Sequence, residues 1–402
     1  MKVFIKTQHE TDVPQVNMLH TNTQAIMSQE DNHVVIADLT EEAIAGLREQ
    51  PQFEVYEDIQ FSPAIALNIG GGWWSRQFNP QPALAPVWAG KTQADVMQHN
   101  KADQAWNVAR GQGVTIAVVD TGTDGAMKEF LSPQRSLDSY APSFSTPWAD
   151  TVGHGTMCAA LACGSKANGG RYNGVAPDAT LLTARTTLLA SDLYLIYQDL
   201  LIKRKAGKFA GGLVVSNSYG LYTCAAPNYP QGHPYVDLVK LCIAEGIVFV
   251  FAAGNNHAFG LCQHPATDDQ PNTIWAVNSI DEVITVGTVD WHESNQVVGG
   301  EHGNSSRGPG QWSVRQDKPD VVAPTYGEVV WGAGYQKMEW WGTSGACPQV
   351  AGLAALLLSR QPTLTPDEIR AAIRNTARPL AAPPNCVGAG IIDCAAAVNS
   401  VP

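Results

Sequence analysis

The chain has 402 residues, of which 44% are hydrophobic and 15% are charged, and its formal net charge at pH 7 is −12. This length suffices for one large domain with a sizeable core and one small accessory domain. The excess of negative charge argues against nucleic acid as a partner. No stretch approaches the roughly eighteen apolar residues that span a bilayer, so we expect no membrane partner either.

The first part of the chain, residues 1–61, predicts a small α+β domain. Apolar or alternating runs at residues 3–5, 34–37 and 53–56 are typical of strands, and Thr40 is placed to begin a helix. The N-terminus turns polar too early for the apolar region of a signal peptide. From the chain as written we therefore expect a cytoplasmic protein, or a secreted one if a signal has been removed.

The next part, residues 62–104, is rich in Gly, Pro, Trp and Gln and shows no sustained period. We predict that it forms a linker and a surface wrap. Beyond it, residues 105–402 predict one larger domain in which helix-like runs alternate with short apolar runs near residues 114–119, 180–184, 213–217, 247–251 and 283–287. This alternation favours an α/β fold with a parallel sheet and helices on both faces. Such sheets bind ligands beyond the carboxyl ends of their strands.

Three polar residues of this domain stand where nucleophilic catalysis needs them. Asp120 directly follows the first predicted strand, and His154 begins a small-residue helix. Ser344 lies at a Gly-flanked turn that leads into a long apolar run. A serine becomes an effective nucleophile when a base removes its proton and a carboxylate orients that base. Taken alone, Ser344 would be ambiguous, because serine is also a favoured helix N-cap.

The order of these residues along the chain argues against two other classes of hydrolase. An α/β-hydrolase carries its histidine after the serine, whereas no histidine follows Ser344. An aspartic protease needs two carboxylate loops, and the Asp-Thr-Gly sequence of residues 120–122 occurs once.

Three segments in this order, Asp-Thr-Gly (120–122), His-Gly-Thr (154–156) and Gly-Thr-Ser-x-x-x-Pro (342–348), resemble the signature segments of the subtilisin-like serine proteases, the subtilases or peptidase family S8. The resemblance covers roughly residues 105–400. It implies a subtilisin-like fold with a catalytic triad of Asp120, His154 and Ser344.

The resemblance also implies roles for residues around the triad. Asn255, which ends the Ala-Ala-Gly-Asn segment, would hold the oxyanion together with the backbone N–H of Ser344. The substrate is expected to bind along Ser218, Tyr219, Gly220, Ala253, Gly254 and His257. Three neighbouring positions depart from the usual family pattern: Met157, Gly345 and Gln349.

The resemblance implies a serine endopeptidase that hydrolyses peptide or protein substrates through an acyl-enzyme. A peptide ligase or macrocyclase, in which an amine resolves the same intermediate, and a peptide-binding pseudoprotease are the alternatives. Residues 1–61 weakly resemble the inhibitory propeptides that precede subtilisin-like domains. This implies a self-processing zymogen whose own N-terminal domain is a partner, with the strand near residues 58–61 in the substrate cleft. An unrelated small domain is the alternative.

Eight cysteines in a chain of this length do not form a disulfide scaffold. Three lie among small residues in two predicted helices and are expected to fill the core: Cys158, Cys163 and Cys347. Cys347 is also the alternative nucleophile. The candidates for pairing are Cys386 with Cys394 and Cys224 with Cys262, and the sequence leaves the connectivity open. No spacing resembles a zinc site, so we expect no cofactor, while calcium stays open as a structural ion.

Overall fold

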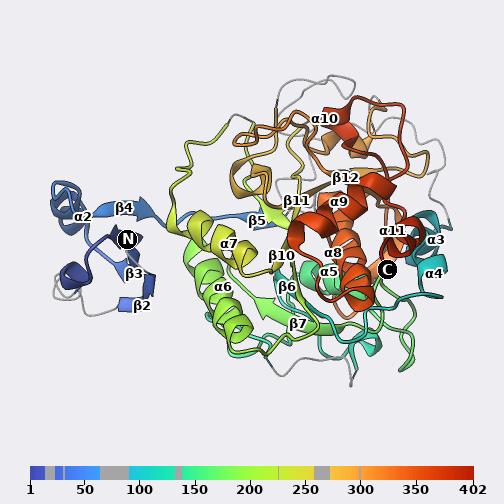
Figure 1. The fold of residues 1–402 in the computed structure, drawn as a ribbon, viewed down its shortest axis with the longest axis horizontal. Coiled ribbons are helices and arrows are strands. Elements are labelled where there is room, and N and C mark those ends of the chain that lie inside the picture. Colours follow the sequence, from blue (N-terminus) through green and yellow to red (C-terminus); the bar gives the residue numbers. More distant parts are fainter. Residues whose placement is uncertain are drawn as a thin grey trace.

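A six-stranded parallel sheet forms the centre of the larger body of the molecule in the computed structural model (Figure 1). The structure describes residues 1–13, 23–29, 32–63, 90–131, 138–224, 226–257, 272–297 and 300–402. The strand order is β12-β11-β10-β8-β6-β7. In chain order these strands are β6 (Thr115–Asp120), β7 (Thr180–Arg185), β8 (Leu213–Asn217), β10 (Val248–Ala252), β11 (Ile284–Val289) and β12 (Val321–Pro324). The five predicted strands are confirmed to within two residues, whereas β12 was not predicted as a strand.

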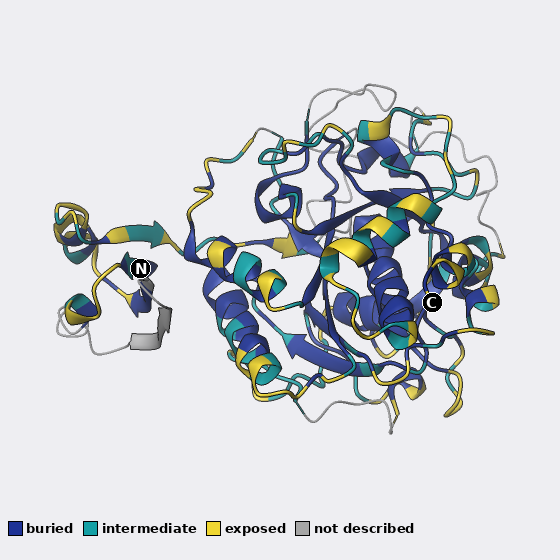
Figure 2. Ribbon diagram, viewed as in Figure 1, coloured by how far each residue is buried: buried dark blue, intermediate teal, exposed yellow. Residues whose placement is uncertain are grey.

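Helices cover both faces of this sheet, as predicted. On one face lie α6 (Ala190–Lys205) and α7 (Pro234–Ala244), and on the other lie α5 (His154–Cys163) and α8 (Gly342–Arg360). Successive side chains of a strand point to opposite faces. In β6, accordingly, Ile116 and Val118 pack in the core that contains α5 and α8, while Ala117 and Val119 pack in the core that contains α6 and α7. Figure 2 shows the strands and α8 buried for most of their length.

The remaining elements of the body are short. The helices are α3 (Gln93–His99), α4 (Ala102–Ala105), α9 (Pro366–Thr376), α10 (Pro384–Val387) and α11 (Cys394–Ser400), and the hairpin consists of β13 (Gly327–Trp331) and β14 (Gly334–Met338). Turns of 3-10 helix cover Glu10–Asp12, Lys128–Phe130, Ala276–Ser279 and Glu301–Asn304. Within the described ranges, none of the helices combines the length and the apolar character needed to cross a membrane.

The first part of the chain forms a separate small unit, which lies beside the body in Figure 1. Its antiparallel sheet has the order β2-β3-β1-β4, with β1 (Lys2–Thr7), β2 (Thr23–Gln29), β3 (Asn32–Asp38) and β4 (Glu54–Glu57). Helix α2 (Glu41–Arg48) begins at Thr40, whose Oγ1 accepts a hydrogen bond from Ala43 N. The predicted α+β pattern is therefore present, and β2, which the sequence analysis missed, is added to it.

The N-terminal unit packs on helices α6 and α7 of the body. Phe4 on β1 lies edge-on to Tyr194 of α6, with ring centroids 5.5 Å apart, and to His233 at the start of α7, at 4.7 Å. Lys6 Nζ pairs with Asp237 of α7 at 2.9 Å. The sheet therefore has two buried faces, one against α2 and one against the body.

Part of the segment predicted as linker and surface wrap is helical instead. Residues 64–89 of that segment lie outside the described residues. Beyond them, Val96 and Met97 of α3 and Ala102 and Ala105 of α4 are buried in the main core. These helices are too short to give a sustained hydrophobic period, although the capping box at Thr92 marks where α3 begins.

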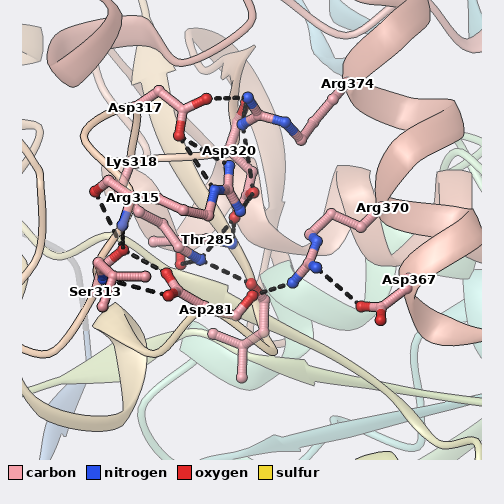
Figure 3. Close-up of polar contacts among 12 residues, drawn as sticks. Asp281, Thr285, Ser313, Arg315, Asp317, Lys318, Asp320, Asp367, Arg370 and Arg374 are labelled. Carbon is pink, nitrogen blue, oxygen red and sulfur yellow. Dashed lines mark hydrogen bonds and ion pairs between the residues drawn. The ribbon is translucent and has the colours of Figure 1, made fainter.

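A buried ion-pair network connects the edge of the sheet to α9 (Figure 3). Asp320, directly before β12, is fully buried and accepts hydrogen bonds from Lys318 Nζ and Arg315 Nη1, both at 2.8 Å. The N–H of Thr285 on β11 donates to the same carboxylate at 2.8 Å. Arg374 of α9 donates to the carbonyl oxygen of Asp320 at 3.1 Å. The network therefore joins β11, β12 and α9 around one carboxylate.

The predicted pairing of Cys386 with Cys394 is wrong. Neither cysteine forms a disulfide, and both are fully buried. They are buried in different hydrophobic clusters, so their proximity in sequence does not bring them together. Cys386 of α10 packs in a cluster with β12, and Cys394 at the start of α11 packs in the cluster that contains α8. Cys224 is disulfide-bonded. Its predicted partner, Cys262, lies outside the described residues.

Candidate active site

Asp120 and His154 are joined directly. Asp120 is the last residue of β6 and His154 is the first residue of α5. His154 Nδ1 lies 2.7 Å from Asp120 Oδ1, and neither side chain is more than 2% exposed. A Cβ on Gly155 would lie 2.2 Å from the carbonyl oxygen of Gly122, so the two segments approach as closely as they do because residue 155 is glycine. The close approach of Asp120, at the end of a strand, to His154, at the start of a helix, thus depends on this backbone contact.

Ser344 is the third residue of α8 and is fully buried. Its Oγ donates to the carbonyl oxygen of Ser218 at 3.1 Å, and Ser218 Oγ donates back to the carbonyl oxygen of Ser344 at 3.0 Å. A Cβ on Gly345 would lie 2.6 Å from Cβ of Trp341, so this departure from the family pattern allows the turn to pack on the tryptophan. The candidate nucleophile is therefore held against the strand predicted to bind substrate.

The side chain of Cys158 contacts both His154 and Ser344. Its Sγ lies 3.9 Å from His154 Nδ1 and 3.7 Å from the carbonyl oxygen of Ser344. His154 Nε2 is buried and has no hydrogen-bond partner among the described residues. Trp331 packs edge-to-face on the imidazole, with ring centroids 6.3 Å apart. The imidazole is thus fixed through Nδ1, and Nε2 has no hydrogen-bond partner in the described part of the chain.

Asn255 lies three residues beyond the end of β10 and is almost fully buried. Its Oδ1 accepts hydrogen bonds from the N–H of Thr343, at 3.1 Å, and from Thr343 Oγ1, at 2.9 Å. The amide must therefore turn its nitrogen the other way, and Nδ2 has no partner in the part of the chain that the structure describes. A buried N–H without a partner beside Ser344 is the arrangement that a developing oxyanion requires.

The predicted substrate strand is already paired with the chain's own N-terminal segment. Strand β5 (Ser62–Pro63) runs antiparallel to β9 (Tyr219–Gly220), with Ser62 opposite Gly220 and Pro63 opposite Tyr219. On its other side, the N–H of Phe61 donates to the carbonyl oxygen of Leu188 at 2.9 Å. Gln60 also forms a bridge with Leu189, so residues 60–63 lie between two segments of the body. That this place is the substrate cleft stays a prediction.

The other candidate binding residues surround this arrangement. Gly254 has φ of 102°, and its carbonyl oxygen accepts a hydrogen bond from the N–H of Ser306. Ala253 donates its N–H to the carbonyl oxygen of Val286 on β11. His257 is fully buried, and its N–H donates to the carbonyl oxygen of Asn304. Its place at the edge of a specificity pocket stays a prediction.

Two residues near the nucleophile, Cys347 and Gln349, have structural roles. Burial raises the pKa of the Cys347 thiol to about 12, and its Sγ donates to the carbonyl oxygen of Val250 at 3.4 Å. Cys347 is therefore a neutral core residue, which argues against it as the alternative nucleophile. Gln349 donates to the carbonyl oxygens of Gly345 and Pro324, each at 2.8 Å, and thereby ties α8 to the end of β12.

The sequence analysis missed one residue of this site, Asp150. Its carboxylate accepts hydrogen bonds from residues on both sides of His154 and from the residue after Asp120. The chain offers few signals for it, since an aspartate in a loop is ordinarily a solvated turn residue.

Two buried side-chain oxygen atoms lie on residues that contact the loop after α5. Glu129 Oε2 and Gln93 Oε1 lack hydrogen-bond partners among the residues described. Both side chains also bind this loop, since Arg171 N donates to Glu129 Oε1 and Gln93 Nε2 donates to the carbonyl oxygen of Asn173. Buried oxygens of this kind suit calcium, which takes oxygen ligands.

The sequence model of the subtilase family matches residues 111–390. The chain belongs to the subtilase family. The match confirms the resemblance drawn from the three ordered segments. It also agrees with the fold, because a crystal structure of MycP1 with its N-terminal propeptide removed is similar over 75% of this chain and 96% of that one, with 25% identity and a TM-score of 0.55.

Relatives of known name support the same family. A calcium-dependent protease of Trichormus variabilis is 31% identical over 339 residues, which cover 75% of this chain and 47% of the relative. Mycosin-1 of Mycobacterium tuberculosis is 32% identical over 323 residues, covering 73% of this chain and 70% of the relative. The serine protease AprX of Bacillus subtilis is 29% identical, covering 73% and 67%. This subtilase thus spans about half the length of the calcium-dependent proteases that it matches.

Proposed function

We propose that this subtilase is a serine endopeptidase in which Ser344 is the nucleophile, His154 is the general base and then the general acid, and Asp120 orients His154. The observation that carries the proposal is the buried His154, whose Nδ1 lies 2.7 Å from Asp120 and whose Nε2 is unpaired among the described residues. Its neighbour Cys158 also contacts the carbonyl oxygen of Ser344. A carboxylate on Nδ1 fixes the tautomer in which Nε2 can accept a proton.

The reaction would begin with a rotation of the Ser344 side chain. Its Oγ leaves the carbonyl oxygen of Ser218 and turns toward His154 Nε2, which takes the proton as Oγ attacks the peptide carbonyl. Asn255 Nδ2 and the N–H of Ser344 donate to the oxyanion of the tetrahedral intermediate. His154 then protonates the leaving amine, and a water molecule hydrolyses the acyl-enzyme through the same base.

Peptide substrates would bind as an extended strand between Tyr219–Gly220 and the segment that contains Leu188. This position is supported by the chain's own residues, since strand β5 pairs there and Phe61 hydrogen-bonds to Leu188. Main-chain hydrogen bonds of this kind give affinity for many sequences, while pockets for side chains give specificity. The N-terminal unit would therefore inhibit the enzyme until it is removed, as in a zymogen.

A structural calcium ion is part of the proposal. Two relatives are named calcium-dependent proteases, and Glu129 Oε2 and Gln93 Oε1 are buried oxygen acceptors without a partner among the described residues. The ion would supply rigidity to the loop after α5. A chelator should lower the thermal midpoint of the Ser344→Ala protein, and Glu129→Gln should lower this response to the chelator.

Labelling and cleavage test the catalytic proposal. A fluorophosphonate probe should label the wild-type protein at Ser344. The protein should also cleave members of a quenched peptide library, and the two products together should weigh one water more than the substrate. Ser359→Ala is a matched control, because Ser359 lies at the other end of the same helix, where its Oγ donates to Leu356 O. Labelling without cleavage would favour a ligase, and the absence of both would favour a peptide-binding pseudoprotease.

A further inference from the structure

Asp150 connects the two loops that carry Asp120 and His154. Its carboxylate accepts five hydrogen bonds. Oδ1 accepts from Thr121 Oγ1 at 2.9 Å and from Gly153 N at 2.8 Å, and the remaining bond to this oxygen comes from Val152 N at 3.0 Å. Oδ2 accepts from the N–H and the hydroxyl of Thr156, at 2.9 and 2.7 Å.

These donors lie within two positions of Asp120 or His154 in the sequence. Thr121 follows Asp120 and Gly153 precedes His154. Thr121 completes the connection, because its Oγ1 also accepts from Gly155 N at 2.9 Å while its own N–H donates to Asp120 Oδ1 at 2.7 Å. A continuous chain of hydrogen bonds therefore runs from the carboxylate of Asp120 through Thr121 and Asp150 to the backbone on both sides of His154.

The backbones around Asp150 are packed too closely to adjust independently. A Cβ on Gly122 would lie 2.2 Å from the carbonyl oxygen of Ala149, the residue before Asp150. The N–H of Thr123 donates to the carbonyl oxygen of Pro147 at 3.2 Å. A shift of the Asp150 loop would thus displace the end of β6, and with it the partner of His154.

We propose that Asp150 is a positioning residue of the catalytic site, which acts through Thr121 to hold Asp120 and His154 in the geometry for proton transfer. The inference rests on the function proposed above. A carboxylate suits this role because it has two oxygens that accept several bonds and no proton to donate, whereas an amide would turn an N–H toward donors on one side. The role is specific to turnover, since the donors flank the reacting groups rather than the substrate strand.

The test compares two variants that break the chain at different links. Asp150→Asn keeps the size of the side chain, and Thr121→Val keeps the carboxylate but removes the bridging hydroxyl. Each should lower kcat per titrated active site by about 10- to 100-fold, the cost of a small misplacement of reacting groups, with KM changed little. The rate of fluorophosphonate labelling of Ser344 should fall in parallel. The combined variant should lose less than the product of the two effects, because both break one chain.

Asp124→Asn is the matched control. Asp124 lies in the same region, but its carboxylate accepts from Ala126 N rather than from a neighbour of the catalytic residues. Its kcat should stay at the wild-type value. A wild-type protein that neither labels nor cleaves would overturn the proposed function itself. If the wild type is active and Asp150→Asn or Thr121→Val turns over at the wild-type rate per titrated site, Asp150 merely stabilises the fold and the inference is wrong.

Discussion

Asp120, His154 and Ser344 come from three separate segments of the chain, β6, α5 and α8, and each of the three residues is buried. Substituting Ser344→Ala, His154→Ala or Asp120→Asn should each lower kcat by about 10⁴-fold or more, the order expected when a triad loses a member. The effects should not add, because the three residues act on the same proton. Steady-state rates on a cleaved library peptide, with circular dichroism to verify the fold, give the comparison.

This result would separate the serine from its nearest competitor. Cys347 lies three residues after Ser344 on the same helix, and burial keeps its thiol neutral. If Ser344→Ala retained substantial activity that was lost in Ser344→Ala/Cys347→Ala, the nucleophile would have to be reassigned.

Asn255 can be tested with two variants, one that removes the amide group and one that replaces only its nitrogen. Asn255→Ala removes both the unpaired Nδ2 and the acceptor of the Thr343 bonds, and kcat should fall by about 10²- to 10³-fold. Asn255→Asp keeps an acceptor for Thr343 but replaces the donor with an oxygen, so it should lose more activity than the alanine variant. Equal or smaller losses in Asn255→Asp, measured as kcat at fixed pH, would show that Nδ2 does not stabilise the transition state.

The sequence predicted the residues of the site better than their contacts. Ordered motifs placed Asp120, His154 and Asn255 at strand and helix ends, and a parallel sheet brings such ends to one edge. The role of Asp150 could not be read in the same way, because its contacts depend on loop backbones from two segments. The inward turn of Asn255 Nδ2 depends likewise on Thr343, which is distant in sequence.

At the scale of the elements, the predictable parts were those with a strong local pattern. The central strands are short, mostly apolar runs, and a capping box at Thr365 marks the start of α9. Helices α3 and α4 are too short to show a period, and the pairing of Cys386 with Cys394 failed because sequence proximity does not specify which core each thiol enters. The positions of these short helices and of the two cysteines therefore depend on tertiary packing, which the local sequence pattern does not specify.

The buried pair of Lys318 and Asp320 should contribute strongly to holding α9 on the sheet. Lys318→Met leaves Asp320 with one fewer cationic partner in a fully buried place, and we expect the free energy of unfolding to fall by about 3–5 kcal/mol. Asp367→Ala, which breaks a pair with Arg370 at the exposed surface, should cost about 1 kcal/mol or less. Urea unfolding of both variants in the Ser344→Ala background, where self-digestion is absent, measures the difference.

The same carboxylate should make stability depend on pH in the acid range. Burial works to raise the pKa of Asp320, but the charges of Lys318 and Arg315 and the hydrogen bonds to it lower the pKa to about 2, from an ordinary value of 3.8. A lowered pKa in the folded protein means that this contribution is fully present above about pH 4 and is lost as the pH falls toward 2. We therefore expect the free energies of unfolding of the Ser344→Ala protein and of Ser344→Ala/Asp320→Asn to approach each other over that interval. A difference in the free energy of unfolding that does not change with pH would show that the charge of Asp320 does not stabilise the fold.

For the whole molecule, the arrangement of the two units should determine when the enzyme becomes active. The N-terminal sheet packs on α6 and α7, and the chain then enters the body as β5 beside Tyr219–Gly220. Asp58 holds this segment on the body, because its carboxylate accepts hydrogen bonds from the N–H and the hydroxyl of Ser191 at 2.8 and 2.6 Å. Any peptide that binds the same strand must displace this segment. The unprocessed protein should therefore bind substrate poorly.

The register of that segment predicts where the chain is cut. Ser62 lies opposite Gly220 and Pro63 opposite Tyr219, so the direction from Ser62 to Pro63 points toward Ser218. The carbonyl oxygen of Ser218 accepts the hydrogen bond of Ser344. We therefore expect the wild-type protein to cleave itself within a few residues after Pro63, while Ser344→Ala stays full length. Intact mass of both purified proteins, followed over time and at several concentrations, measures the cut and its order. A Tyr219→Pro variant, which cannot donate its backbone N–H in that strand, should process more slowly. If the wild type and Ser344→Ala were cut at the same bond, a foreign protease would be responsible. If neither were cut, the N-terminal unit would be a permanent domain and the proposed zymogen would be wrong.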